Sequence, residues 1–161
     1  MESLIAVIGT LLGVTVAGLF QHRAAGRAEA AAWKAELRRE RLAAVTELAG
    51  RASAHRRAMY MRGDARLRGE SAERVEQLRA DSHATRSEVT EPLVRVRILI
   101  QDPEVQAAAD AMVAATFGMR RADGTTDSEV TRERLTESRT AAVEAHDRFV
   151  DVAAGYLAGT N

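Results

Sequence analysis

The side chains that could perform acid–base or metal chemistry are few and scattered along this 161-residue chain. The four histidines, His22, His55, His83 and His146, lie far apart in the sequence. None has a second His, Asp or Glu three or four residues further along, which is the spacing that would share a metal ion on one helix face. Each histidine is therefore expected to be solvated or to extend its ring toward solvent.

Other catalytic patterns are also missing from the sequence. His146 is followed directly by Asp147, and neighbouring residues on a helix point in different directions, so a hydrogen-bonded dyad is not expected. No G-x-S-x-G turn is present, and Gly118 and Gly124 do not form a phosphate-binding loop. The chain has no cysteine, which excludes disulfides, thiolate metal sites and a cysteine nucleophile. We therefore predict a non-enzymatic protein with no cofactor and no metal site.

Basic residues gather toward the N-terminal side, although the net charge is zero. Segment 22–74 has more basic than acidic residues, and segment 75–161 has more acidic ones. Arginine and lysine near a membrane are attracted to anionic lipid headgroups. The residues expected to contact lipid headgroups or another polyanion are Arg23, Arg27, Lys34, Arg38, Arg39 and Arg41.

A membrane tether for nucleic acid is an alternative for these basic residues. It would use Arg38, Arg39, Arg41, Arg51, Arg56 and Arg57. Glutamates are interleaved with these arginines, and neither stacking aromatic residues nor a DNA-reading motif accompanies them. Nucleic acid is therefore the weaker prediction for a partner.

Segment 3–20, SLIAVIGTLLGVTVAGLF, has no charged residue. As a helix it would be about 27 Å long, close to the roughly 30 Å hydrocarbon core of a bilayer. A signal peptide is one alternative, but Glu2 is the only charge before the run, and Val16-Ala17-Gly18 matches a cleavage site poorly. A buried core helix is another, but no large polar residue interrupts any face. The sequence therefore predicts a single transmembrane helix over residues 1–21.

Two further expectations follow from this predicted anchor. Gly9, Gly13 and Ala17 recur at every fourth position, a spacing at which small residues let two helices pack closely in lipid, so we expect self-association through this face. Lysine and arginine follow the run and do not precede it, which places the C-terminal domain, residues 22–161, in the cytoplasm. The predicted localisation is thus the cell membrane, with a single pass.

Helical periodicity dominates the rest of the chain. Asp102-Pro103-Glu104 is the clearest helix start, with Asp102 as N-cap and Pro103 at the first helical position. Gly63 and Gly69 are expected to bracket a turn. The predicted helices cover about residues 22–62, 70–101, 103–117 and 128–158.

Two stretches test the helical interpretation most closely. In Leu93–Ile100 arginines alternate with apolar residues as in a strand, but no partner strand is evident, so we interpret it as a buried helix end after a kink at Pro92. The last helix has the clearest apolar seam: Leu135, Ser138, Ala142, Ala145, Phe149, Val152 and Tyr156.

These features predict an all-α protein, an N-terminal transmembrane helix followed by an antiparallel helical bundle with coiled-coil-like packing. The seams are rich in alanine and bury little apolar area, so we expect help from a partner chain, as in a homo-oligomer.

The N-terminal pattern SLIAVIGTLLGVTVAGLFQHR and the following RRERLAAVTELA resemble the small actinobacterial membrane proteins grouped as Kil-type plasmid-spread proteins. That family is associated with the movement of conjugative plasmids between mycelial compartments. The resemblance carries no catalytic or binding motif, so it implies a setting and no residue roles.

The predicted function is a membrane-anchored, non-enzymatic helical adaptor or scaffold. It would self-associate or recruit an unknown protein partner at the inner face of the cell membrane, and the resemblance implies plasmid transfer as its setting. An outward-facing envelope spacer of the spanin type is an alternative, which the charge asymmetry around the hydrophobic run opposes.

Overall fold

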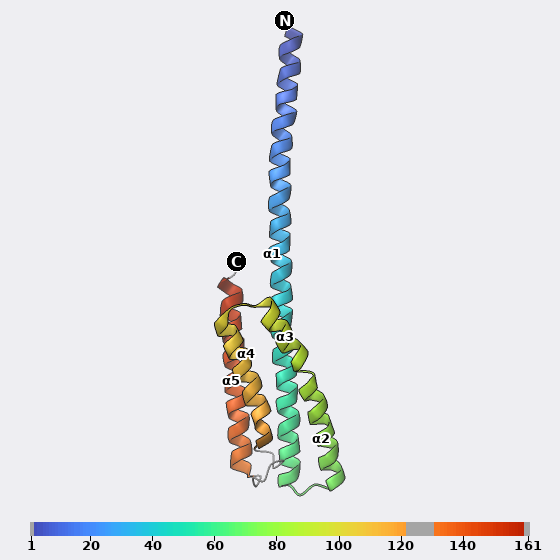
Figure 1. Cartoon of the computed structure of the whole chain (residues 1–161), viewed down its shortest axis with the longest axis vertical. Helices are drawn as coiled ribbons and strands as arrows, with labels where there is room; N and C mark the ends of the chain where they lie inside the picture. Colours follow the sequence, from blue (N-terminus) through green and yellow to red (C-terminus); the bar gives the residue numbers. More distant parts are fainter. Residues whose placement is uncertain (1, 122–130, 160–161) are drawn as a thin grey trace. The chain divides into compact units, whose positions relative to one another are not determined.

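A computed structural model describes the backbone of residues 2–121 and 131–159, and the side chains of residues 25–120 and 131–159. Every regular element in these ranges is helical, as predicted (Figure 1). The elements are α1 (Glu2–Leu67), α2 (Ala72–Ser87), α3 (Thr90–Leu99), α4 (Pro103–Gly118), the short 3-10 helix η1 (Met119–Arg121) and α5 (Arg132–Gly159).

The chain divides into two compact units, Met1–Arg39 and Glu40–Asn161. The first unit is the N-terminal part of α1. Its described side chains, from residue 25 onward, are exposed except for a half-buried Leu37, and Trp33 is 71% exposed. The second unit holds the hydrophobic core.

The predicted transmembrane anchor requires a correction. Within the part of the chain that the structure describes, no helix combines the length and the apolar character needed to cross a membrane. The physical reason is that the described side chains of α1 are mostly arginine, glutamate and alanine, with no apolar stretch of the roughly 20 residues that a span requires. This finding overturns the predicted single transmembrane helix over residues 1–21, and with it the single-pass localisation with a cytoplasmic C-terminal domain.

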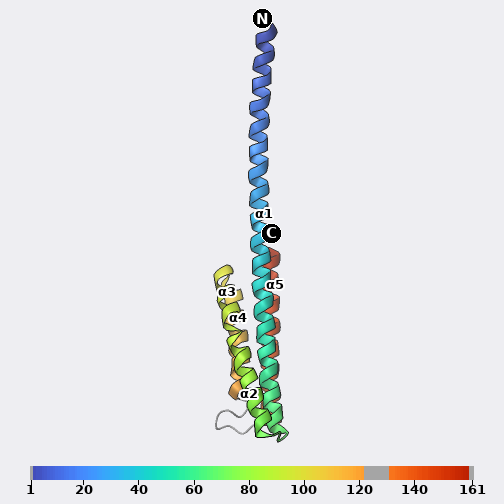
Figure 2. The same cartoon turned by 90° about the vertical axis from the view of Figure 1, so that its right-hand side faces the viewer.

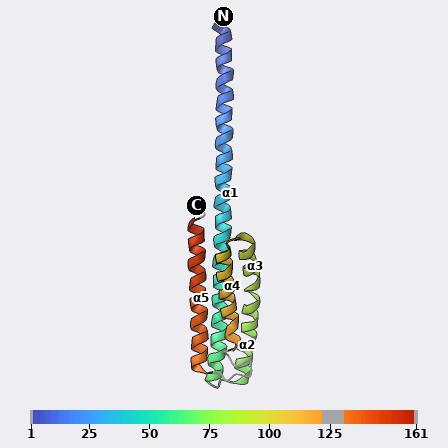
Figure 3. The ribbon, with the colours of Figure 1, turned by 60° about the vertical axis from the view of Figure 1, so that its left-hand side comes forward.

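In the second unit, the C-terminal part of α1 and the whole of α5 run antiparallel side by side (Figures 2 and 3). Contacts near both ends of α5 fix this pairing, since Arg132 binds Asp64 and Arg41 lies over the Tyr156 ring. The helical bundle is consistent with the prediction. Its core is built from α1, α3, α4 and α5 and includes Ala44, Leu48, Ala52, Val96, Val105, Ala109, Met112, Phe149 and Ala153.

Local sequence explains most of the helix ends. Asp102 Oδ1 accepts hydrogen bonds from the backbone N–H groups of Glu104 and Val105, both at 3.0 Å, and Pro103 is the first residue of α4, as predicted. At the end of α1, Gly69 has a φ of 67°, which glycine adopts without steric cost, and the chain turns there.

The structure differs from the predicted boundaries at two places. Helix α1 continues through Gly63 to Leu67, because Gly63 is buried inside the helix against Leu135 and does not open a turn. The predicted helix over 70–101 is two helices, α2 and α3. The break comes at residues 88–89, just before Pro92, because a proline ring clashes with the carbonyl four residues earlier.

Segment Leu93–Ile100 is helical up to Leu99, and only part of it is buried. Val96 and Ile100 are fully buried, whereas Val94 and Ile98 are 47% and 68% exposed. The interpretation as a helix end is confirmed, but its burial is restricted to one face.

Candidate functional site: an apolar groove between α1 and α5

A groove of about 480 Å³ runs between α1 and α5 in the second unit. Leu42 and Val150, one on each wall, remain 54% and 39% exposed. Large apolar side chains exposed in a groove favour a partner that covers them. The α1 wall consists of Leu42, Val45, Thr46, Ala49, Gly50 and Ser53, and the α5 wall of His146, Val150, Ala154 and Leu157.

The polar groups in the α1 wall are already satisfied within that helix. The Thr46 hydroxyl donates to the Leu42 carbonyl at 2.8 Å, and Ser53 Oγ accepts a hydrogen bond from Arg56 Nη2 at 3.0 Å. Neither group requires a hydrogen bond from an occupant. An occupant of this groove therefore meets a surface that is apolar in effect.

At one end of the groove, the α1 side carries a positive charge at Arg56 and the α5 side a negative charge at Asp147. Burial lowers the pKa of the Arg56 guanidinium, and the nearby Asp147 carboxylate opposes that effect. The buried Nη1 of Arg56 has no hydrogen-bond partner among the described residues. His146 Nδ1 lies 3.1 Å from Asp147 Oδ1, so the expectation that these neighbours do not interact is wrong.

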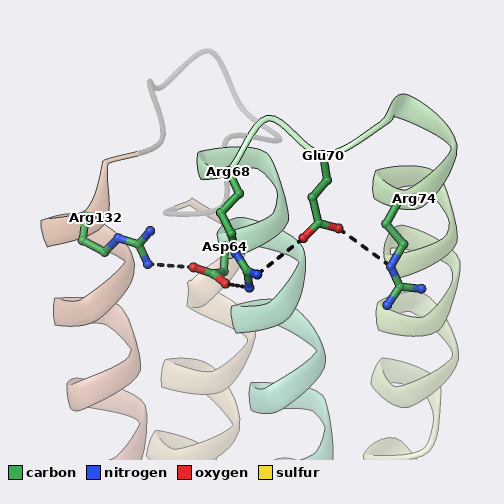
Figure 4. A network of polar contacts seen from close by, with 5 residues as sticks. All are labelled: Asp64, Arg68, Glu70, Arg74 and Arg132. Atoms are coloured by element: carbon green, nitrogen blue, oxygen red, sulfur yellow. Dashed lines mark hydrogen bonds and ion pairs between the residues drawn. The ribbon is translucent and has the colours of Figure 1, made fainter.

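A second polar cluster joins α5 to the end of α1 and the turn before α2 (Figure 4). Asp64, 9% exposed, accepts hydrogen bonds from Arg68 and from Arg132, the latter at 2.6 Å. Hydrogen bonds from Arg68 and then Arg132 hold the pKa of Asp64 below its usual value. Glu70 continues the chain of contacts, 3.8 Å from Arg68 and 3.9 Å from Arg74. The cluster fixes the start of α5 and has no nucleophile–base pair.

His55 is buried, so the prediction of a solvated ring is wrong for this residue. Its Nδ1 lies 3.0 Å from Thr85 Oγ1, and its ring meets Phe117 edge to face at 5.3 Å. The Arg86 guanidinium lies over the Phe117 ring, 4.0 Å from its centroid. These contacts attach α2 and the end of α4 to α1.

The structure places the predicted contact residues in different settings. The side chains of Gly9, Gly13, Ala17 and Arg23 lie outside the described residues. Arg27, Lys34, Arg38 and Arg39 are exposed on the first unit of α1, where Arg39 binds Glu36 at 2.9 Å.

Arg41 belongs to the second unit and forms its contacts with other residues of that unit. Its Nε donates to the Leu99 carbonyl at 2.9 Å, and its guanidinium lies 5.6 Å from the Tyr156 ring centroid. Of the other arginines considered for nucleic acid, Arg51 binds Glu88 at 2.7 Å. Lipid or nucleic-acid contact by these residues stays a prediction.

Comparison with known proteins identifies relatives over most of the chain. A family model described as KilB plasmid transfer protein matches residues 42–157. Protein KilB of Streptomyces lividans is 42% identical over 155 residues, which cover 96% of this chain and 96% of that protein. No solved structure matches the chain.

Proposed function

We propose a function from one premise: the chain belongs to the KilB family of plasmid transfer proteins. Its role in plasmid transfer follows from that membership. Within this role, we propose that the chain is a non-enzymatic helical scaffold or adaptor. The groove between α1 and α5 is the surface that binds a protein partner.

The observation that carries this proposal is the apolar groove itself. Leu42 and Val150 extend from opposite walls and stay about half exposed, and the wall hydroxyls are satisfied within α1. Fully burying a leucine or valine side chain stabilises by about 1.5–3 kcal/mol. An amphipathic helix laid in the groove would gain this burial while the Thr46 and Ser53 hydroxyls keep their hydrogen bonds.

The polar residues of the groove support binding over catalysis. Ser53 and His146 both line it, and Asp147 lies beside the histidine. However, Ser53 Oγ accepts its hydrogen bond from Arg56, and among the described residues no hydrogen bond joins Ser53 to His146. Among the described residues, Ser53 thus has no hydrogen-bonded general base, which a serine nucleophile requires.

The test is a transfer assay in a host whose own copy of the gene is deleted. Val150→Glu places a charge in the groove, and Val94→Glu makes the same change at an exposed valine on α3, outside the groove. At equal protein levels, Val150→Glu is expected to reduce plasmid transfer and Val94→Glu to leave it unchanged. Wild-type transfer by the Val150→Glu variant would refute the role of the groove.

A further inference from the structure

The occupant of the groove can be identified from the two walls, an inference that rests on the proposed function. We propose that a second copy of this chain fills it. In this dimer α1 of one copy lies on α5 of the other, and the two grooves close on each other around a two-fold axis parallel to the helices. Such an interface is isologous, because each copy contributes the same surface.

Charge complementarity supports a second copy. Arg57 is exposed on α1 beyond the groove, and Asp147 and Asp151 are exposed on α5. Arg57 and Asp151 have no ion pair among the described residues, and the Asp147 side chain, 67% exposed, lies beside His146 and near Arg56. Placing α1 on the partner's α5 brings the exposed Arg57 to the side of the exposed Asp147 and Asp151 twice. Placing α1 on the partner's α1 would bring like charges together, which disfavours that pairing.

The directions of the side chains fit the same arrangement. In an α-helix each Cα–Cβ bond tilts toward the N-terminus of its own helix. Because α1 and α5 are antiparallel, Arg57 leans along the groove in one direction and Asp147 in the other. In the proposed dimer Arg57 of each copy therefore leans toward Asp147 of the other.

The α1 wall has open space at Gly50 for a second helix. Gly50 lies exposed in the interior of α1 on the groove wall, and a Cβ added there would meet no atom within 4 Å. Nothing inside one chain requires glycine at this position, and glycine weakens a helix interior. Small residues allow two helices to approach closely, and Thr46 and Ala154 flank the same path. Gly50 therefore leaves room for a second helix to approach this wall.

Pairs of single-cysteine chains test the geometry directly, since the chain has no native cysteine. Full-length Gly50→Cys and Val150→Cys chains with different tags are mixed and oxidised, so that only disulfides between chains can form. We expect a disulfide joining the two variants. Ala80→Cys, exposed on α2 away from the groove, serves as the control and is expected to join neither. The proposal would be overturned if no disulfide formed between positions 50 and 150. It would also be overturned if position 80 formed as much disulfide with either of them.

Charge reversal gives a second readout that does not depend on cysteine reactivity. Arg57→Asp and Asp147→Arg, each alone, are expected to raise the dimer dissociation constant of the full-length chain about tenfold in sedimentation velocity. The double variant should restore the wild-type constant, because the pair re-forms with its charges exchanged. If the double variant has a dimer dissociation constant as high as those of the single variants, this pairing is refuted.

The two proposals fail in distinguishable ways. A chain that stays monomeric, but loses transfer with Val150→Glu, would refute the second copy and leave the groove as the site of another helix. A chain that dimerises through the groove, but transfers normally when Val150→Glu disrupts the dimer, would support the pairing and refute the proposed function.

Discussion

Lowering the pH is expected to destabilise this protein through one buried histidine. His55 is 2% exposed, with its ring between Thr85 and Phe117. Burial, followed by the positive charges of Arg86 and His83, lowers its pKa from 6.5 to about 4, although a hydrogen bond with the Ser82 backbone opposes the shift. The folded protein therefore resists protonation of a ring that the unfolded chain protonates readily.

The sign of the effect follows from proton binding. Between pH 6.5 and about 4, the unfolded chain binds a proton at His55 that the folded protein does not. Stability therefore falls as pH falls through this range and is regained above it. Each pKa unit corresponds to about 1.4 kcal/mol, so protonation of this residue costs up to about 3 kcal/mol of unfolding free energy.

Urea unfolding followed by circular dichroism measures this loss. We would compare the wild type with His55→Gln, whose side chain forms hydrogen bonds but does not titrate, at pH 7 and pH 4.5. The wild type should lose about 2–3 kcal/mol more than the variant over this interval. Carboxylates titrate alike in both proteins, so the difference isolates His55. An equal loss in both proteins would refute the account of the buried ring.

Two further predictions concern packing and charge. Gly63→Ala should destabilise the fold by about 1 kcal/mol, because the added Cβ would lie 2.8 Å from the Leu135 Cδ1 atom and this overpacking outweighs the gain in helix propensity. Gly155→Ala has open space around it and should stabilise the fold by up to about 1 kcal/mol. Thermal unfolding of both variants measures the two effects. Asp64→Asn should cost about 1–2 kcal/mol at pH 7, because hydrogen bonds from Arg68 and Arg132 weaken. Because the pKa of Asp64 is lowered in the folded protein, the stability that its carboxylate contributes is complete above the ordinary aspartate pKa and is lost as the pH falls below it. The unfolding free energies of the variant and the wild type should therefore converge in acid. A difference in unfolding free energy that stays constant with pH would contradict this.

Features that depend on neighbouring residues could be predicted from the sequence. The start of α4 at Asp102-Pro103 follows from backbone groups that only local residues can satisfy. The apolar seam of α5 was also correct: Leu135, Ala142 and Phe149 are buried, because a single partner surface covers one stripe of that helix.

Features that depend on distant residues could not be predicted. Gly63 was expected to open a turn, and its actual role is set by Leu135, on another helix. Leu42 recurs with Val45, Ala49 and Ala52 at helical spacing along α1, yet it is 54% exposed. The reason is that periodicity identifies an apolar face and does not say whether another helix covers it. The groove was missed for this reason. A signal that could have indicated it is Gly50, a glycine inside a helical seam without a turn.

The proposed function requires that a partner covers the groove while the protein works, and the chain's lack of cysteine allows a direct measurement. Single-cysteine Val150→Cys and Val94→Cys chains would be labelled with a membrane-permeant maleimide in cells that are transferring plasmid. We predict slow labelling at position 150 in these cells, with fast labelling at position 94 and at position 150 in the dilute purified chain. Equally fast labelling at both positions in the cells would contradict it.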